Sequence, residues 1–264
     1  MTRKLPAGTC IGHAVASVRH NIAYAFRISW PWYLIVIPLT IAVSLVLSYA
    51  AGGDLGQNQG LMLLNNMISG FLLGFAFASI AVNWHRYILL DEVPDSRGIL
   101  RLDDKVWRYF GNIILIFLIL VVAGFLIGIP FGIIAALTSL AMSPLFPILL
   151  FIIIVPIAGT IAMRLSVKLP AIALGRTDFG LKDALTVTRG NSLPIFLVAL
   201  FEIVCLLASL LLIGLLAAGL NQLSPGLAIA VAYVLHFAAN WLITIFSITV
   251  LTSLYGFFVE GRDF

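Results

Sequence analysis

Charged residues are scarce in this chain of 264 residues. Only 10% of its residues are Asp, Glu, Lys or Arg, whereas 62% are hydrophobic. Soluble globular domains have roughly 25% charged and 45–50% apolar residues. This shortage, with a mean hydropathy of +1.13, excludes a soluble domain and indicates a polytopic membrane protein. The net charge of +4 is explained by charge-biased loops, so we expect no nucleic-acid partner.

Cysteine and the motifs of common enzymes are also lacking. The two cysteines, Cys10 and Cys205, have neither a disulfide partner nor the spacing of metal ligands. The chain contains no P-loop, GxSxG, HExxH or CxxC motif, and each of these would have indicated a particular chemistry. We therefore predict no catalytic residues, no metal and no cofactor, and a protein that is not an enzyme.

Six long hydrophobic runs are present, each long enough to cross a bilayer as a helix of about 20 residues. The first begins only near Ser29, too late for an ordinary signal peptide, so we interpret it as a retained span. The sequence thus predicts an all-α membrane bundle, one integral membrane domain over residues 1–264 with six transmembrane helices in three hairpins. The predicted spans are residues 30–49, 61–90, 113–137, 145–167, 193–220 and 227–258.

The basic residues predict how the chain is threaded through the membrane. All 15 Lys and Arg residues lie near the starts of the odd-numbered spans or the ends of the even-numbered spans. The three alternate turns contain none. Because positively charged loops stay in the cytoplasm, we expect a protein of the bacterial cytoplasmic (inner) membrane with both termini on the cytoplasmic side.

Three short amphipathic segments precede the three hairpins and indicate an internal repeat. Their ends are similar: Arg19-His-Asn21, Arg108-Tyr-Phe-Gly-Asn112 and Arg189-Gly-Asn191. We expect each to form a short interfacial helix on the cytoplasmic side, the first over residues 10–27. Arg19, Arg108 and Arg189 are predicted to reach lipid phosphates. Membrane lipids are therefore the expected partners, with other membrane proteins or a second copy of the chain as further candidates.

One group of polar residues falls inside the predicted spans. Glu202 is the only acidic residue within a span, and His236 and Asn240 lie four residues apart on the sixth span. A carboxylate in lipid is costly, so Glu202 must be protonated, paired or in contact with water. Two interpretations stay open. One is a proton- or substrate-linked site of a small-molecule or lipid transporter, and the other is an interhelical hydrogen-bond network that fixes packing.

Polar residues at the exit of the second span also have two interpretations. Acidic side chains gather there at Asp91, Glu92, Asp95, Asp103 and Asp104. They could hold a divalent cation for a membrane-embedded enzyme, but their spacing matches no metal-binding loop. We favour charge pairing with the interleaved Arg and Lys residues beside anionic lipid headgroups. His85 is expected at the membrane interface with Trp84.

Glycines spaced four residues apart indicate close helix contacts. The two series are Gly70 and Gly74 on the second span, and Gly124, Gly128 and Gly132 on the third. Small residues at this spacing let helix backbones approach one another. We favour packing within one chain, and dimerisation is the alternative.

Four stretches resemble a known family: WHRYILLDEVPD, LPAIALGR, ALTVTRGN and LTSLYGFFVEGRD. With them the chain looks like a group of uncharacterised six-span inner-membrane proteins common in proteobacteria, and this resemblance covers most of the chain. More distantly, its layout is similar to the YciC-type proteins and to the membrane domain attached to some glycerophosphodiester phosphodiesterases. These resemblances imply a six-span bundle, no hydrolase activity and no functional residues. The function expected is that of a non-enzymatic protein acting through lipid and protein contacts in envelope homeostasis.

Overall fold

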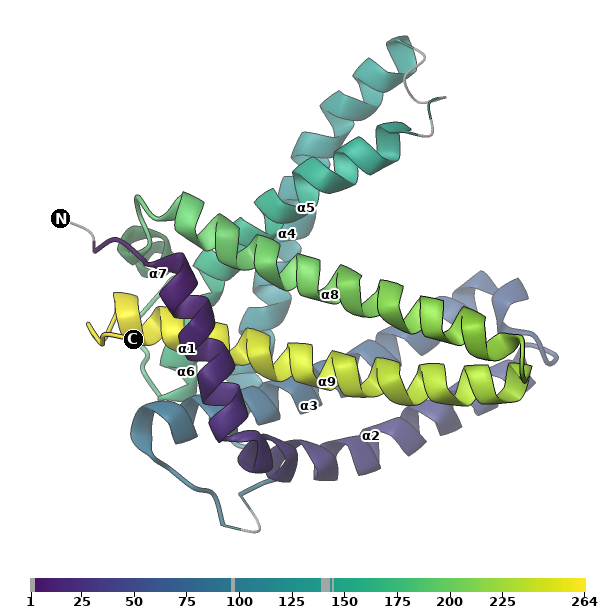
Figure 1. Cartoon of the computed structure of the whole chain (residues 1–264), viewed down its shortest axis with the longest axis horizontal. Coiled ribbons are helices and arrows are strands. Elements are labelled where there is room, and N and C mark those ends of the chain that lie inside the picture. The colour runs from purple at the N-terminus through teal and green to yellow at the C-terminus, as the bar shows by residue number, and fades with distance from the viewer. Residues whose placement is uncertain (1–2, 96–97, 139–142, 144) are drawn as a thin grey trace.

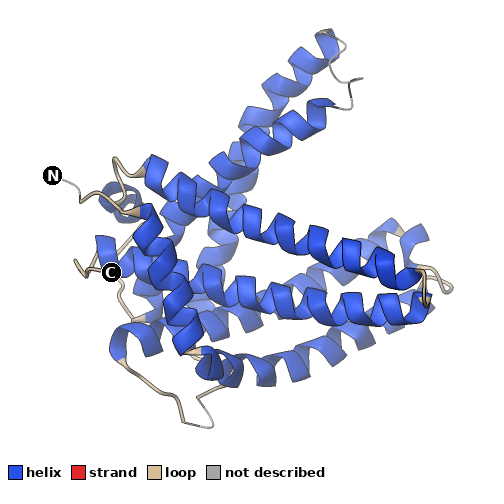
Figure 2. Cartoon of the chain, viewed as in Figure 1, coloured by secondary structure: helices blue, strands red, loops and turns tan. Residues whose placement is uncertain are grey.

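The computed structural model describes residues 3–95, 98–138, 143 and 145–264, and within these ranges it contains helices and no strand (Figure 2). The long helices are α2 (Ile22–Ala50), α3 (Gln59–Leu90), α4 (Asp104–Leu137), α5 (Leu145–Ser166), α8 (Ser192–Asn221) and α9 (Pro225–Phe258). The short ones are α1 (Ala7–His20), the 3-10 turn η1 (Leu55–Gln57), α6 (Lys168–Ala173) and α7 (Leu181–Val187). The predicted all-α fold with six apolar helices of membrane-spanning length is confirmed.

The long helices form three hairpins that share one end of the molecule. α2 pairs with α3, α4 with α5, and α8 with α9. In Figure 1 the hairpins α2–α3 and α8–α9 both extend to the right, whereas α4–α5 diverges toward the top. The two termini, α6 and α7 gather at the left, where α1 packs across α8 and α9. We call this shared end the base, and the turns at the other ends of the hairpins the distal turns.

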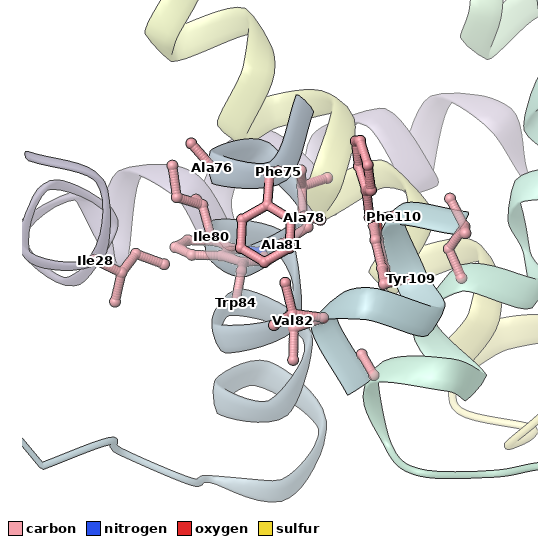
Figure 3. Close-up of a cluster of buried hydrophobic side chains, with 14 of the residues drawn as sticks. Ile28, Phe75, Ala76, Ala78, Ile80, Ala81, Val82, Trp84, Tyr109 and Phe110 are labelled. Carbon is pink, nitrogen blue, oxygen red and sulfur yellow. The ribbon is translucent and has the colours of Figure 1, made fainter. Parts of the chain in front are cut away.

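The buried core lies at the base. Figure 3 shows Trp84 of α3 in a cluster with Tyr109 of α4 and Ile28 of α2, and all three side chains are fully buried. Toward the distal turns the apolar side chains are exposed instead. Leu126 on α4 is 71% exposed and Leu211 on α8 is 62% exposed. Such extensive apolar surface is stable when lipid surrounds it, which agrees with a multi-pass membrane protein.

The first amphipathic segment is shorter than the predicted helix over residues 10–27. α1 ends at His20, and Asn21 interrupts the helix with φ −113° and ψ 21° before α2 begins. α1 contacts α8 and α9 through small side chains, because Cys10 and Ala14 are both fully buried. Its fixed position therefore comes from packing on the last hairpin.

The other two amphipathic segments differ from each other. The second has no break before its span, since α4 runs continuously from Asp104 to Leu137 after Asp103 caps its start by accepting a hydrogen bond from the Val106 amide. The third is α7, which is followed by a turn and then Asn191 at the start of α8. Asn191 has φ −112° and ψ 21°, almost the same conformation as Asn21 between α1 and α2.

Candidate functional site

A hydrogen-bonded histidine lies inside the base. Nδ1 of His85 on α3 is 2.8 Å from the hydroxyl of Thr252 on α9, and its Nε2 is 3.1 Å from the hydroxyl of Tyr109 on α4. All three residues are buried. His85 and Trp84 were expected at the membrane interface, but neither side chain has any exposed surface, so neither contacts lipid headgroups. His85 joins three helices with both ring nitrogens occupied, so its role is to fix their packing.

Glu92, just beyond the end of α3, binds two arginines. Nε of Arg86 donates to Glu92 Oε1 over 2.8 Å, and Arg101 lies 3.1 Å from the same oxygen. The hydrogen bond from Arg86, and then that from Arg101, lowers the pKa of Glu92 to about 2, although burial opposes this shift. Arg101 also lies 3.1 Å from Asp103. The predicted charge pairing is thus confirmed for Glu92 and Asp103. In the described ranges, no three His, Cys, Asp or Glu side chains converge as metal ligands would.

The N-terminal segment is attached to the base through Asn191. The backbone amide of Leu5 donates to Asn191 Oδ1 over 2.9 Å, and Asn191 Nδ2 donates to the carbonyl of Arg3 over 2.9 Å. Arg3 also forms an ion pair with Asp263 near the other terminus. Asn191 is fully buried. An asparagine singled out by the similarity of the segment ends therefore joins the start of α8 to the N-terminal segment, and Arg3 links that segment to the C-terminal one.

The three arginines predicted to contact lipid headgroups all lie at the base, in different surroundings. Arg19 ends α1 and Arg189 follows α7, and both are exposed. Neither guanidinium forms an ion pair or hydrogen bond with any residue that the structure describes. Arg108 on α4 is 37% exposed and lies 3.8 Å from the Asp104 carboxylate. Arg19 and Arg189 are therefore the two whose charge is available to an external anion.

Glu202 and His236 are not brought together. The polar group beside Glu202 is the hydroxyl of Ser247 on α9, which is eleven residues from His236, or about 16 Å along the helix. Oε1 of Glu202 is buried and has no hydrogen-bond partner among the described residues. Glu202 also lies near α1, because burial and then the charge of Glu202 raise the pKa of the Cys10 thiol to about 12. Glu202 therefore lies apart from His236 and Asn240, the two residues with which it was predicted to form one polar site.

His236 and Asn240 remain neighbours and line a cavity of about 280 Å³ between α2, α3 and α9. Tyr33 of α2 and Tyr233 of α9 contribute to the same wall. A second cavity of about 460 Å³ between α8 and α9 shares Tyr233 and His236 with the first. The walls of these two cavities therefore contain an imidazole, an amide and two phenol groups.

The predicted glycine contacts occur at one position. A Cβ added to Gly74 on α3 would lie 2.9 Å from Cε2 of Phe110 on α4, so Gly74 lets these two helices approach. At the other four glycines of the two series, an added Cβ would meet no described atom within 4 Å. These are Gly70, Gly124, Gly128 and Gly132. Packing within one chain therefore does not explain these four glycines, and dimerisation through them stays a prediction.

Fold and site together define an α-helical multi-pass membrane protein with a tightly bonded polar base and more open, lipid-exposed hairpins. No protein-family model, curated protein or solved structure matches the chain.

Proposed function

We propose that this protein is a non-enzymatic component of the bacterial cytoplasmic membrane that acts through lipid and protein contacts in envelope homeostasis. The observation that carries the proposal is the state of the basic side chains at the base. Arg86 and Arg101 are paired internally, whereas Arg19 and Arg189 are exposed without a described acidic partner. Exposed arginines beside apolar helices are suited to anionic lipid headgroups.

The distribution of charge supports placing the base, with both termini, in the cytoplasm. The basic residues that the structure describes lie at or near the base, and the distal turns have no Lys or Arg in the sequence. Positively charged segments stay on the cytoplasmic side. The internal repeat is a part of the same proposal. It is supported by Asn21 and Asn191, which have nearly equal φ and ψ and each directly precede a long helix.

The lipid-contact function is tested by neutralising Arg19, Arg108 and Arg189 together with Gln. The purified full chain is equilibrated with phosphatidylglycerol in mild detergent, washed, and analysed for retained lipid by mass spectrometry. A basic residue near an anionic membrane surface contributes about 1 kcal/mol, so we expect retention to fall at least about tenfold. Replacing the same three residues by Lys keeps the charge and should keep most of the lipid. Equal retention by the Gln variant and the native protein would contradict the proposal.

A transporter is the second candidate, and the cavity lined by His236 and Asn240 favours it. Polar side chains inside membrane segments commonly mark substrate or proton pathways. The test replaces Glu202 by Gln and His236 by Ala, separately, and measures both folded yield and a proton-dependent growth phenotype. A transporter requires that the phenotype is lost while the folded yield is kept. Reduced yield with an unchanged phenotype would assign these residues to packing alone.

A further inference from the structure

A groove of about 570 Å³ separates α2 from α9. The two helices do not pack closely along their length, and aromatic rings bridge the gap at two levels. Phe26 contacts Trp241 edge to face with ring centroids 6.2 Å apart, and Tyr33 contacts Phe237 in the same manner at 5.1 Å. Aromatic rings thus line the groove and meet across it, and its volume is within the range of about 300–1,000 Å³ found for small-molecule sites.

The lining of the groove is suited to a hydrocarbon chain. It contains no charged side chain, and most of it is formed by aromatic and aliphatic groups such as Trp30 and Leu34. The hydroxyl of Ser29 donates to the carbonyl of Ala25 over 2.7 Å, and the residue is only 1% exposed. Trp30 and Leu34 lie in the first apolar span, so the surrounding medium is the bilayer. An occupant must therefore be apolar and come from the membrane.

Arg27 is not part of the lining, but it directly follows Phe26, the lining residue of α2 nearest the base. Arg27 precedes Trp30 by three residues and Leu34 by seven, and residues at these spacings share one face of a helix. Its side chain is exposed and has no ion pair with any described acid. Trp30, one turn further along α2, is 44% exposed, as expected of an indole at the level of the headgroups. Arg27 therefore supplies a positive charge where a lipid phosphate would lie.

We propose that the groove between α2 and α9 binds one anionic glycerophospholipid, with its phosphate at Arg27 and an acyl chain along the aromatic rings of the lining. This proposal rests on the lipid-contact function proposed above and assigns it a specific site. The groove adjoins the cavity of His236 and Asn240, since Tyr33, Ile37 and Phe237 line both.

The size of the groove favours a lipid chain over a helix from a partner or from a second copy. A helix is about 10 Å wide with its side chains, so ten residues of helix, about 15 Å long, occupy more than about 1,000 Å³. The groove of about 570 Å³ between α2 and α9 therefore cannot enclose such a helix, which would place only one face in it. An acyl chain is narrower and flexible, and it can lie inside the groove beside the rings that meet across it.

The test uses a phosphatidylglycerol probe with a photoactivatable diazirine in its acyl chain. The full chain is reconstituted into vesicles of equal parts phosphatidylcholine and phosphatidylglycerol that carry the probe, irradiated, and digested for mass spectrometry. We expect the probe on peptides from residues 30–38 and 237–241, at a yield several-fold above that on the exposed face of α8. The same probe with a phosphatidylcholine headgroup should label the groove about fivefold less, because the charge of Arg27 selects the anionic headgroup.

Two variants separate the chain site from the headgroup site. Ala238→Phe fills the groove and should abolish the labelling, while Ala208→Phe, on an exposed part of α8 outside the groove lining, should leave it unchanged. Arg27→Gln should remove the preference for phosphatidylglycerol and keep the chain labelling, whereas Arg27→Lys should keep both. Equal labelling of the groove and of α8, or labelling unaffected by Ala238→Phe, would overturn the proposal.

Other occupants give different products. A photoreactive residue at position 238 should yield an adduct of lipid mass; an adduct of twice the chain mass would identify a second copy and reject the lipid. The variant with Gln at 19, 108 and 189 separates this proposal from the proposed function. If this Gln variant retains as much lipid as the native protein while the probe labels the groove, only the proposed function fails. If the Gln variant loses lipid while the probe does not label the groove, only the groove site fails.

Discussion

Replacing Glu92 by Gln removes a carboxylate that pairs with two arginines at the base. The side chains of Arg86 and Arg101 are only 14% and 15% exposed, and that of Glu92 is 36% exposed. The substitution keeps the shape of the side chain and removes its charge. Arg86 retains a hydrogen bond to the carbonyl of Ala173 over 3.0 Å, and Arg101 retains the carboxylate of Asp103 at 3.1 Å. The variant should therefore fold, with lower stability.

The expected loss of unfolding free energy on replacing Glu92 by Gln follows from the pKa of Glu92. Its fall from the ordinary value of 4.5 to about 2 corresponds to an upper bound of about 3 kcal/mol at neutral pH. Because the carboxylate is 36% exposed, screening by solvent reduces this to about 1.5 kcal/mol. A lowered pKa contributes stability that is fully present above pH 4.5 and is lost as the pH falls toward 2. The difference in unfolding stability between the native protein and the Gln variant should therefore be full above pH 4.5 and disappear as the pH falls toward 2.

The measurement is unfolding of the full chain in mixed micelles with increasing sodium dodecyl sulfate, followed by helical circular dichroism from pH 7 down to about pH 2. Comparing the two proteins at each pH isolates Glu92 from the other acids. The control is Asp104→Asn, because Asp104 is 82% exposed and 3.8 Å from Arg108, and such pairs contribute about 0–1 kcal/mol. An unchanged unfolding midpoint for Glu92→Gln, or an equal loss for Asp104→Asn, would show that Glu92 does not stabilise the base through its two arginines.

Two further predictions concern single contacts. Gly74→Ala should cost about 1 kcal/mol, because the new Cβ would lie 2.9 Å from the buried ring of Phe110. Gly70→Ala should be neutral or slightly stabilising in the same assay, since its Cβ meets nothing within 4 Å, and equal effects would contradict this. Asn191→Ala should leave the amide of Leu5 unpaired and cost about 1–3 kcal/mol. We expect faster hydrogen exchange of the Leu5 amide in Asn191→Ala, and an unchanged exchange rate would contradict the prediction.

The sequence predicted the six long apolar helices, and that number is confirmed. The helices α2 and α4 begin at Ile22 and Asp104, eight and nine residues before the predicted spans, whereas the other helix ends lie within two residues of the predicted limits. The agreement has a simple cause. A bilayer requires runs of about 20 apolar residues, and the polar turns between them interrupt the pattern clearly.

The positions of polar groups were harder to predict, for a physical reason. In a membrane protein the face of a helix toward lipid is as apolar as the face toward protein, so periodicity does not identify the buried side. His85 and Trp84 lie beside Arg86 in the sequence and therefore suggested an interface, yet both are fully buried. Glu202 was grouped with His236 by depth, but its neighbours are Ser247 on α9 and Cys10 on α1. The spacing of the polar residues within the last hairpin does not predict which of them contact α1.

The contacts that hold the helix ends together and the groove proposed to bind lipid are located in different parts of the protein. At the base, buried His85 joins α3, α4 and α9, and the partly exposed Glu92 pairs with Arg86 and Arg101. The cost of separating buried polar partners keeps these helix ends fixed. Between α2 and α9 the contacts are ring to ring across a groove, and such apolar contacts can be replaced by an acyl chain without leaving a polar group unpaired. A bound lipid would thus change the separation of the first and last hairpins while the base stays intact. Variants of the base should therefore alter unfolding, and variants of the groove should alter lipid occupancy at nearly constant stability.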